Sequence, residues 1–512
     1  MTTLWRKTWR GLALRIETDE AEESSGAGTG ARSLSVGPSD ESDTWLRFHP
    51  FSAAPYWCIS STGSESDVET RPLDERGDPV AECIAILEAD VSPLIERATG
   101  QSENVAARET ADVAVLLAAE RALRHRPAVL DELDPVALRN RRSEKWHTYP
   151  SDVLPVWVAE MDFPIAAPIQ DELRRFVESG DVGYPIGLRE TGLPDVFCER
   201  MREGFSWSPD PARVEILSEV VQGMYVALEA FSEPGQGIAV QTPIYPPFLG
   251  SIRDTGRELI DNPMLLGDAG MTFDLDGLAS TVTPGTRMLL FCNPHNPSGR
   301  VYRRDELERL AEIAVENDLV VVSDEIHGDL LFDGRTHIPL ATVGPEIARR
   351  TITLTSASKA FNIPGLRTAI AHFGDPALQR RFNTVLPRHA RGGIGLFGLY
   401  AIMAAWRWAQ PWLNEVVPYL AENRVFAERA LAERIPEIGF IQPEATYLAW
   451  LDCRALDLRP SPSAHFLQHG RVALSEGRAF GEAWAGFARL NLATSRPILA
   501  EAIDRMSKAL GR

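Results

Sequence analysis

The sequence predicts an α/β fold in which helices cover a mostly parallel sheet. Short, nearly continuous apolar runs end in polar residues, as strands buried on both faces do: VEIL (214–217), GIAVQTP (237–243), RMLLFCNP (287–294), LVVVSDE (319–325) and TITLTSASK (351–359). Helical segments separate them, such as residues 305–319, where Leu307, Leu310, Ala311 and Ala314 recur at helical spacing. Strands that alternate with helices form parallel sheets, and function gathers at the carboxyl ends of such strands.

The length and charge of the chain restrict its organisation and its partners. Its 512 residues exceed what a single core holds, about 250–300 residues, so we expect two or three domains. The formal net charge of −20 repels phosphate backbones and anionic lipids, which favours a small-molecule substrate over nucleic acid or a membrane. The sequence has no secretory signal or membrane-spanning run, and its five scattered cysteines form no zinc or disulfide pattern. We therefore expect a cytoplasmic protein without a bound metal.

Residues 1–125 form an N-terminal extension that differs from the rest of the chain. Residues 15–45 are acidic and rich in Ser and Gly, which predicts a mobile loop or linker. Residues 45–60 alternate in part, and residues 78–98 have a helical periodicity that Pro93 interrupts. We expect a small, partly flexible α/β module whose motifs indicate no function.

Lysine is rare in this sequence. Of the 52 basic residues only four are lysines: Lys7, Lys145, Lys359 and Lys508. Lys359 comes directly after a predicted buried strand, a position that fits a solvated surface lysine poorly. Arginine cannot form a Schiff base, so we expect Lys359 to carry a chemical function that arginine cannot perform.

Polar motifs follow three of the predicted strands: CNPHNPSG (292–299), SDEIHGD (323–329) and SASKAFN (356–362). Asn296 precedes Asp324 by 28 residues, and Asp324 precedes Lys359 by 35. In order and spacing these motifs resemble the fold-type I pyridoxal 5′-phosphate (PLP) enzymes of the class I/II aminotransferase superfamily. The resemblance covers about residues 127–512.

The resemblance implies a domain organisation. A large PLP-binding domain with a mostly parallel sheet would span residues 179–415, and a small α/β domain would span residues 416–512. Residues 126–178 would belong to the small domain and cover the active site, and the N-terminal module would be an addition to the fold.

The resemblance also assigns roles to the residues of the three motifs. Lys359 would hold PLP as a Schiff base and then act as general base at the substrate Cα. Asp324 would pair with the pyridine nitrogen, which must stay protonated for PLP to withdraw electrons, and Asn296 would donate to the ring hydroxyl. Taken as residues alone, Asp324 could instead cap a turn and Asn296 could be an ordinary Asn-Pro turn residue.

Other residues match contacts to the phosphate, the ring and the substrate. Phosphate contacts are implied for Gln222, Gly223, Met224, Ser356 and Arg367. Tyr245 would stack on the pyridine ring, and Tyr184 would reach the phosphate of the neighbouring subunit, which implies a homodimer. Arg489 would bind the α-carboxylate of an amino-acid substrate; its alternative is a salt bridge to a structural Asp, because burying an unpaired charge is costly.

Two segments and one substitution indicate a branch of the superfamily. VWVAEMDF (156–163) resembles a segment that folds over the active site, and ATYLAWLD (445–452) resembles a strand of the small domain. His327, expected beside the cofactor, stands where aspartate-type transaminases have tyrosine. This combination is similar to the cystathionine β-lyase/C–S lyase branch of MalY/PatB type.

The branch implies β-elimination, in which an L-cysteine S-conjugate or a cystathionine-like substrate gives a thiol, pyruvate and ammonia. Alternatives are an aminotransferase and a specialised-metabolism enzyme that acts on a large cysteine S-conjugate, including decarboxylation-coupled deamination. A third is an aminotransferase-like transcriptional regulator, which the acidic extension disfavours because it lacks a basic recognition helix.

Overall fold

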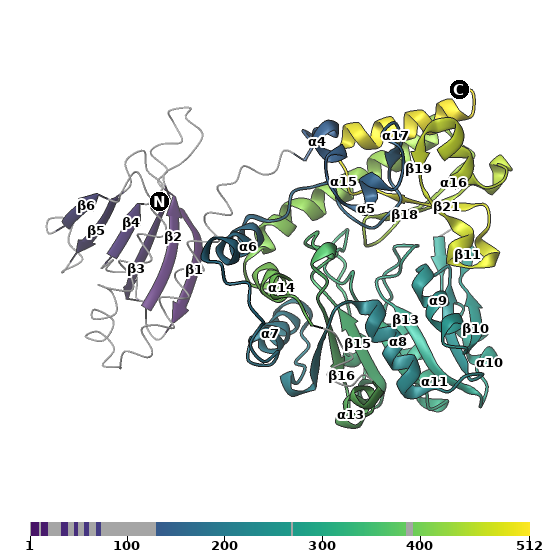
Figure 1. The fold of residues 1–512 in the computed structure, drawn as a ribbon, viewed down its shortest axis with the longest axis horizontal. Coiled ribbons are helices and arrows are strands. Elements are labelled where there is room, and N and C mark those ends of the chain that lie inside the picture. Colours follow the sequence, from purple (N-terminus) through teal and green to yellow (C-terminus); the bar gives the residue numbers. More distant parts are fainter. Residues whose placement is uncertain are drawn as a thin grey trace. The chain divides into compact units, whose positions relative to one another are not determined.

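In the computed structural model the chain divides into two units, residues 1–121 and 122–512 (Figure 1). The structure describes the backbone of six strands in the first unit, and residues 130–267, 270–385 and 393–512 of the second.

The strands of the first unit form one antiparallel sheet and follow one another in chain order: β1 (Thr2–Trp9), β2 (Leu12–Thr18), β3 (Arg32–Pro38), β4 (Leu46–His49), β5 (Tyr56–Ser60) and β6 (Val68–Pro72). The predicted loop over residues 15–45 is therefore wrong for β3 and for residues 15–18, which end β2. Its register brings apolar residues opposite one another, Leu34 with Ile16 and Phe48, and Val36 with Leu14 and Leu46. This period of two is a strand signal that the Ser-rich composition obscured. The helix predicted over residues 78–98 lies outside the described residues.

A seven-stranded sheet forms the centre of the second unit. Its order is β10 (Glu258–Pro263), β9 (Gly237–Thr242), β13 (Thr286–Cys292), β14 (Val320–Asp324), β15 (Thr351–Thr355), β16 (Ala369–Phe373) and β8 (Val214–Leu217). All five apolar runs of the sequence are strands of this sheet, which confirms the predicted α/β fold. The first five strands are parallel, and β16 is antiparallel to both of its neighbours.

Helices cover both faces of this sheet, because alternate strand residues point to opposite sides. Leu290 and Val322 pack with helices α8 (Val220–Phe231), α9 (Pro246–Asp254) and α13 (Pro376–Val385). Leu289 and Val321 pack on the other face with α10 (Leu275–Thr281), α11 (Arg304–Glu316) and α12 (Pro345–Arg350). The four apolar residues predicted for one side of α11 are all buried.

A second, smaller sheet has the order β17 (Gly439–Ile441), β18 (Leu448–Asp452), β21 (Phe487–Asn491) and β20 (Ser475–Glu476). Its core is shared with α4 (Pro135–Arg139), α5 (Glu144–His147), α15 (Gln410–Arg434) and α17 (Arg496–Ala509), and α16 (Pro462–His465) lies against β20 and β21. The segment that precedes VWVAEMDF joins this layer through the pairing of β7 (Leu154–Pro155) with β19 (Val472–Ala473). The predicted domain boundary after residue 415 falls inside α15, which is 25 residues long.

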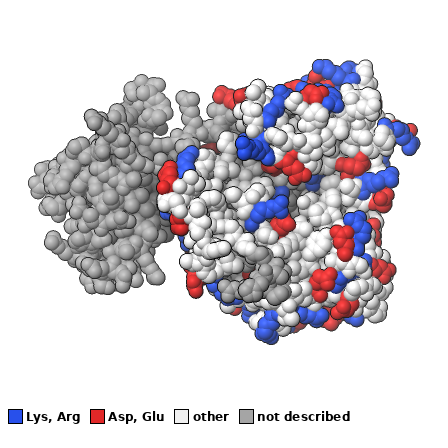
Figure 2. Space-filling view, viewed as in Figure 1, with Lys and Arg blue, Asp and Glu red and all other residues white. Residues whose placement is uncertain are grey.

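Three further helices pack beside the large sheet: α6 (Ala167–Ser179), α7 (Leu193–Phe205) and α14 (Leu396–Trp408). A short hairpin joins β11 (Leu265–Gly267) to β12 (Gly270–Thr272). In the part of the chain that the structure describes, no helix combines the length and hydrophobicity that crossing a membrane requires. Acidic and basic side chains are interspersed over the face of the second unit that Figure 2 shows.

Candidate active site

The three polar motifs meet because the strands that carry them are neighbours in the sheet. β13, β14 and β15 lie side by side and run parallel, so their carboxyl ends share one edge. This arrangement brings together Asn296, Asp324 and Lys359, as the sequence predicts for the centre of the site.

Asp324 is a buried carboxylate at the end of β14, and only 6% of its surface is exposed. Its Oδ1 accepts one hydrogen bond, from the backbone N–H of Ile326 at 3.1 Å. Burial raises the pKa of Asp324 to about 7, although the charge of Lys359 acts in the opposite direction. Among the described residues, Asp324 forms no ion pair. A protonated ring nitrogen placed here would supply the missing positive partner.

Lys359 lies in the turn that follows β15. Its Nζ donates to the main-chain carbonyl of Ala159 at 2.9 Å. Burial, and then the charge of Arg489, lower the pKa of Lys359 to about 8. A lysine with this pKa is a neutral amine far more often near neutral pH than an exposed lysine, as a nucleophile or a general base requires.

The Ala159 carbonyl has a second donor that sequence reasoning missed. The hydroxyl of Tyr447, which is 1% exposed, donates to it at 3.0 Å. Tyr447 belongs to the ATYLAWLD segment. The sequence predicted that this segment is a strand, but it indicated no role for the tyrosine. Its position beside Lys359 depends on the packing of the small domain against the large one, which the strand pattern does not contain.

The VWVAEMDF segment is held in place through its own main chain. Every main-chain carbonyl from residue 157 to residue 163 accepts at least one hydrogen bond from a side chain. The donors are Arg489, Ser475, Asn491, Tyr447, Lys359, Lys145, Asn362 and Arg141. Lys359 and Arg489 are among these donors, so the segment lies against both residues. That the segment covers the active site stays a prediction.

Lys145 explains part of this arrangement, and it was not expected to be buried. Its Nζ forms an ion pair with Asp162 at 2.8 Å, and neither side chain is more than 1% exposed. The Trp146 indole donates to the same carboxylate at 2.7 Å. The rarity of lysine would therefore predict a special role for Lys145, which is structural, as readily as for Lys359. Only the motifs around Lys359 distinguish the two residues.

The predicted phosphate contacts lie around the first turn of α8. Gln222 and Gly223 are in this turn and Met224 directly follows it, at the end of the helix where the dipole favours an anion; the Gly223 N–H itself donates to the Glu219 carbonyl at 3.4 Å. Arg367 joins the same place through an ion pair with Glu219, the N-cap residue of α8. The Ser356 hydroxyl donates to the Thr368 carbonyl at 2.7 Å.

Gly223 also has a packing role. A Cβ at this position would lie 2.8 Å from Leu354 of β15 and 2.9 Å from Leu217 of β8. The glycine therefore lets α8 approach the sheet closely, and this close approach fixes the position of the first turn of the helix relative to the site.

Arg489 is 4% exposed and projects from β21. Its guanidinium donates to Asn296 Oδ1 at 2.9 Å, to the Trp157 carbonyl at 3.0 Å and to the Ser475 hydroxyl at 3.2 Å. Among the described residues, none offers it a carboxylate within ion-pair distance. Burial lowers its pKa to about 10. The alternative of a structural Asp partner is thus not what the described residues show.

His327 and Tyr245 complete the enclosure of the predicted ring site. Burial, and then the positive charges of Lys359 and Arg489, lower the pKa of His327 to about 3, so its imidazole is neutral. Tyr245 is the N-cap residue of α9, and burial raises its pKa. The charges of Arg489 and Asp324 act on its hydroxyl, so Tyr245 lies near enough to both residues to interact with them.

Tyr184 is not part of this cluster within a single chain. It lies between α6 and α7 and is fully exposed, and the neighbouring apolar residues Val182 and Ile186 are 64% and 55% exposed. Its predicted role, contact with the cofactor of a second subunit, stays a prediction.

Comparisons with known proteins agree with the motifs. Residues 210–506 match the family model described as aminotransferase class I and II. The chain is 34% identical over 362 residues to cystathionine beta-lyase PatB of Bacillus subtilis, an alignment that covers 70% of this chain and 93% of that protein. It is 36% identical to cystathionine beta-lyase of Corynebacterium glutamicum, over 73% of this chain and 98% of that protein.

A solved structure has the same fold. The chain is 28% identical to cystalysin from Treponema denticola, whose structure contains a pyridoxal 5′-phosphate cofactor. The TM-score is 0.71, and the superposition covers 75% of this chain and 99% of cystalysin.

Proposed function

Because the chain belongs to the aminotransferase class I and II family, we propose that it is a PLP-dependent C–S lyase that cleaves the Cβ–S bond of an L-cysteine S-conjugate. PLP is its cofactor. When bound, PLP supplies an aldehyde that combines with amines and a ring that withdraws electrons from the bonds at the substrate Cα.

The residues of the site fit this cofactor. Asp324 is a buried carboxylate without a cationic partner among the described residues, and it would hold the protonated pyridine nitrogen. The first turn of α8, with Ser356 and Arg367, would hold the phosphate. Lys359 would hold the aldehyde carbon, because its lowered pKa makes the neutral amine accessible.

Arg489 is the single observation that carries the choice of substrate class. Its buried guanidinium has no carboxylate partner in the described ranges of the chain, which carries a large cost that a bound anion would offset. The planar fork of arginine suits a carboxylate, and the α-carboxylate of an amino acid is such a group. Asn296 and the Trp157 carbonyl orient the guanidinium from two sides.

Lys359 then moves the proton at the reacting carbon. Its amine takes the proton from Cα, and the electron pair released there expels the thiolate from Cβ. Water hydrolyses the remaining unsaturated amine, so that one substrate and one water give one thiol, one pyruvate and one ammonia. No electron acceptor is needed, because the bond that breaks is heterolytic and the thiolate keeps its electron pair.

The active unit is a homodimer in this proposal. Val182, Tyr184 and Ile186 form an exposed apolar run of 55% to 102% exposure, which a second copy would cover. Tyr184 would then reach the phosphate of the partner's cofactor. Sedimentation of wild-type protein and of Tyr184→Ala tests this part of the proposal, with a monomeric wild type as the contrary result.

The function itself is tested by product analysis. Purified enzyme is supplied with cystathionine and with S-alkyl and S-aryl conjugates of L-cysteine, and thiol, pyruvate and ammonia are measured together. The proposal expects the three products in equal amounts for at least one conjugate and none from Lys359→Ala. Loss of the amino group without release of a thiol would favour the aminotransferase alternative.

A further inference from the structure

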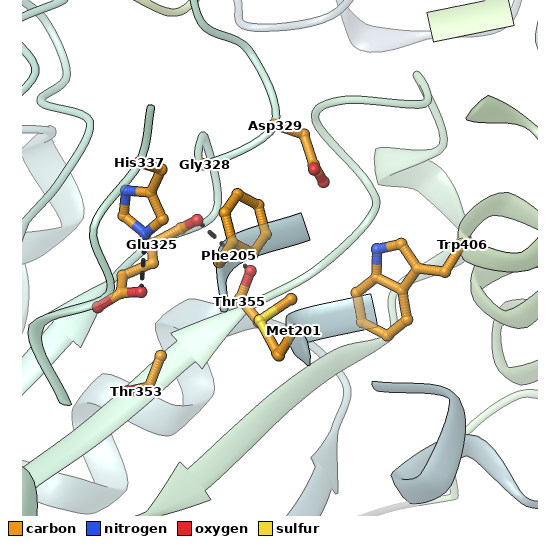
Figure 3. Close-up of a pocket in the computed structure, with 9 residues that line it drawn as sticks. All are labelled: Met201, Phe205, Glu325, Gly328, Asp329, His337, Thr353, Thr355 and Trp406. Carbon is orange, nitrogen blue, oxygen red and sulfur yellow. Dashed lines mark hydrogen bonds and ion pairs between the residues drawn. The ribbon is translucent and has the colours of Figure 1, made fainter. Parts of the chain in front are cut away.

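A second buried carboxylate, Glu325, directly follows Asp324 in the chain. It is 5% exposed, and it lines a small cavity with room for about one water molecule. Among the other residues that line the cavity are Phe205, Gly328, Asp329, His337 and Thr355 (Figure 3). None of these residues has a part in the chemistry proposed above.

The carboxylate of Glu325 is fully engaged by donors. Its Oε1 accepts from the Ser323 hydroxyl at 2.7 Å and from the backbone N–H of Leu340 at 3.1 Å. Its Oε2 accepts from Nε2 of His337 at 2.9 Å, the bond drawn in Figure 3. Because an unpaired buried carboxylate is costly, these donors fix the side chain in one position.

The backbone of Glu325 is held as tightly as its side chain. Its N–H donates to the Leu354 carbonyl of β15 at 2.8 Å. Its carbonyl accepts from the Gly328 N–H at 3.0 Å and from the Thr355 hydroxyl at 3.4 Å. Both the N–H and the carbonyl of Glu325 are therefore hydrogen-bonded to residues of β15.

The same turn packs directly on the imidazole of His337. A Cβ at Gly328 would lie 3.1 Å from His337 Cδ2, so the ring and the turn are in close contact. The ring is also edge-on to Phe205 of α7, with centroids 5.3 Å apart. A displacement of His337 would therefore be transmitted to the turn.

The other end of the turn has its own anchor. Asp329 forms an ion pair with Arg200 of α7 at 2.5 Å, and Arg200 also donates to Gln410 at 2.7 Å. Residues 325–329 thus span two anchors, and His327 projects from the middle of the span. Asp324 immediately precedes the first anchor.

We propose that Glu325 and His337 form a positioning pair that holds Asp324 and His327 in the geometry that the cofactor ring requires. Neither member of the pair touches the cofactor or the substrate; both act through the turn. The inference rests on the proposed function for its purpose, because the two residues that it positions are those expected beside the ring.

The variants Glu325→Gln and Glu325→Ala test the pair. The amide of glutamine keeps the acceptor for Ser323 and Leu340, whereas alanine removes every contact of the side chain. Glu172→Ala is the matched control, because Glu172 is also a buried carboxylate with an ion-pair partner, Arg175, and lies on α6 outside the site. His337→Asn removes the second member of the pair.

Two measurements distinguish positioning from general stability. The first is the NMR signal of the His327 ring in apoprotein labelled at histidine. The protein has ten histidines in all. The second is the dissociation constant of PLP, from titration of the apoprotein. We expect Glu325→Ala to shift the His327 signal and to weaken PLP binding by about tenfold or more, the usual scale for loss of a supporting contact. Glu325→Gln should restore most of the affinity, and Glu172→Ala should change neither quantity.

The contrary result is a folded Glu325→Ala protein with an unchanged His327 signal and wild-type affinity for PLP, which would overturn the positioning role. If Glu325→Ala does not fold, Glu325→Gln and His337→Asn decide. A His327 signal that moves in His337→Asn supports the pair, and one that moves in neither variant refutes it. Failure of wild-type protein to bind PLP would refute the proposed function instead, while the His327 signal of the apoprotein still tests the pair.

Discussion

Replacement of Arg489 by alanine should separate substrate binding from folding. The guanidinium is buried, yet its partners in the described part of the chain are an amide oxygen, a main-chain carbonyl and a hydroxyl. Alanine removes these three hydrogen bonds, but it also removes a buried positive charge that has no counterion among the described residues. The two effects on the free energy of unfolding oppose each other, so we expect a small net change.

The effect on catalysis should be much larger. A charge-assisted bidentate contact to the substrate carboxylate contributes on the order of 2–4 kcal/mol, which corresponds to a fall in kcat/KM of roughly 30- to 1000-fold. Most of the loss should be in KM, because the carboxylate is bound in the ground state as well as in the transition state. Affinity for PLP should change little, since Arg489 is expected to contact the substrate.

Arg424→Ala is the control for a structural arginine. Arg424 is also buried, but both of its terminal nitrogens donate to the carboxylate of Asp333 at 2.8 Å. Its loss should lower the melting temperature and leave kcat/KM near the wild-type value. Steady-state kinetics and thermal unfolding of both variants make the comparison. If Arg489→Ala unfolds as readily as Arg424→Ala and keeps the wild-type KM, Arg489 is a structural residue and the substrate assignment is wrong.

Three further predictions concern the cofactor site. Lys359→Ala should abolish the absorption band of the Schiff base that PLP forms with the wild-type protein; borohydride reduction and peptide mapping of the wild type check this, and a label on another lysine would contradict it. Asp324→Asn should stabilise the apoprotein above pH 7 and not below about pH 4, while weakening PLP binding. The reason is that burial raises the pKa of Asp324 from 3.8 to about 7. Between these pH values the folded protein binds more protons than the unfolded chain, so its stability falls as the pH rises. Urea unfolding at several pH values measures the effect. Tyr447→Phe should raise the pKa of Lys359 above about 8, because the Ala159 carbonyl loses its neutral donor and attracts the ammonium more strongly. The pH midpoint of PLP capture by apoprotein should then move upward, whereas Tyr225→Phe, which removes a hydroxyl that donates to Asp254 at the surface, should leave it unchanged.

Five strands of the large sheet, β8, β9, β13, β14 and β15, could be predicted from the sequence because each is a short, largely buried and mostly apolar run. The edge strand β10 is mostly exposed and lacks this pattern, and neither it nor β16 was predicted. The same reasoning located Asp324 and Lys359, since residues at the ends of adjacent parallel strands must meet. β3 was missed because its alternating Leu34 and Val36 stand in a Ser-rich context that also suits a loop.

Tertiary packing determines the parts of the site that the sequence did not reveal. Tyr447 meets Lys359 only through the carbonyl of Ala159, which comes from a third segment of the chain. Glu325 stands in a motif that was recognised, but its partner His337 is twelve residues away and carries no motif. Lys145 shows the limit of an argument from residue rarity, because its burial with Asp162 is visible only in the fold.

The number of turnovers without an acceptor tests the central claim most directly. Enzyme reconstituted with PLP and freed of 2-oxo acids is mixed with an excess of an L-cysteine S-conjugate, and thiol and pyruvate are followed per active site. β-Elimination returns the cofactor to its starting form, so we predict many turnovers, with thiol and pyruvate in equal amounts and no effect of added oxo acid. A single turnover that stops with the cofactor in its amine form, and resumes only when an oxo acid is supplied, would show an aminotransferase and contradict the lyase assignment.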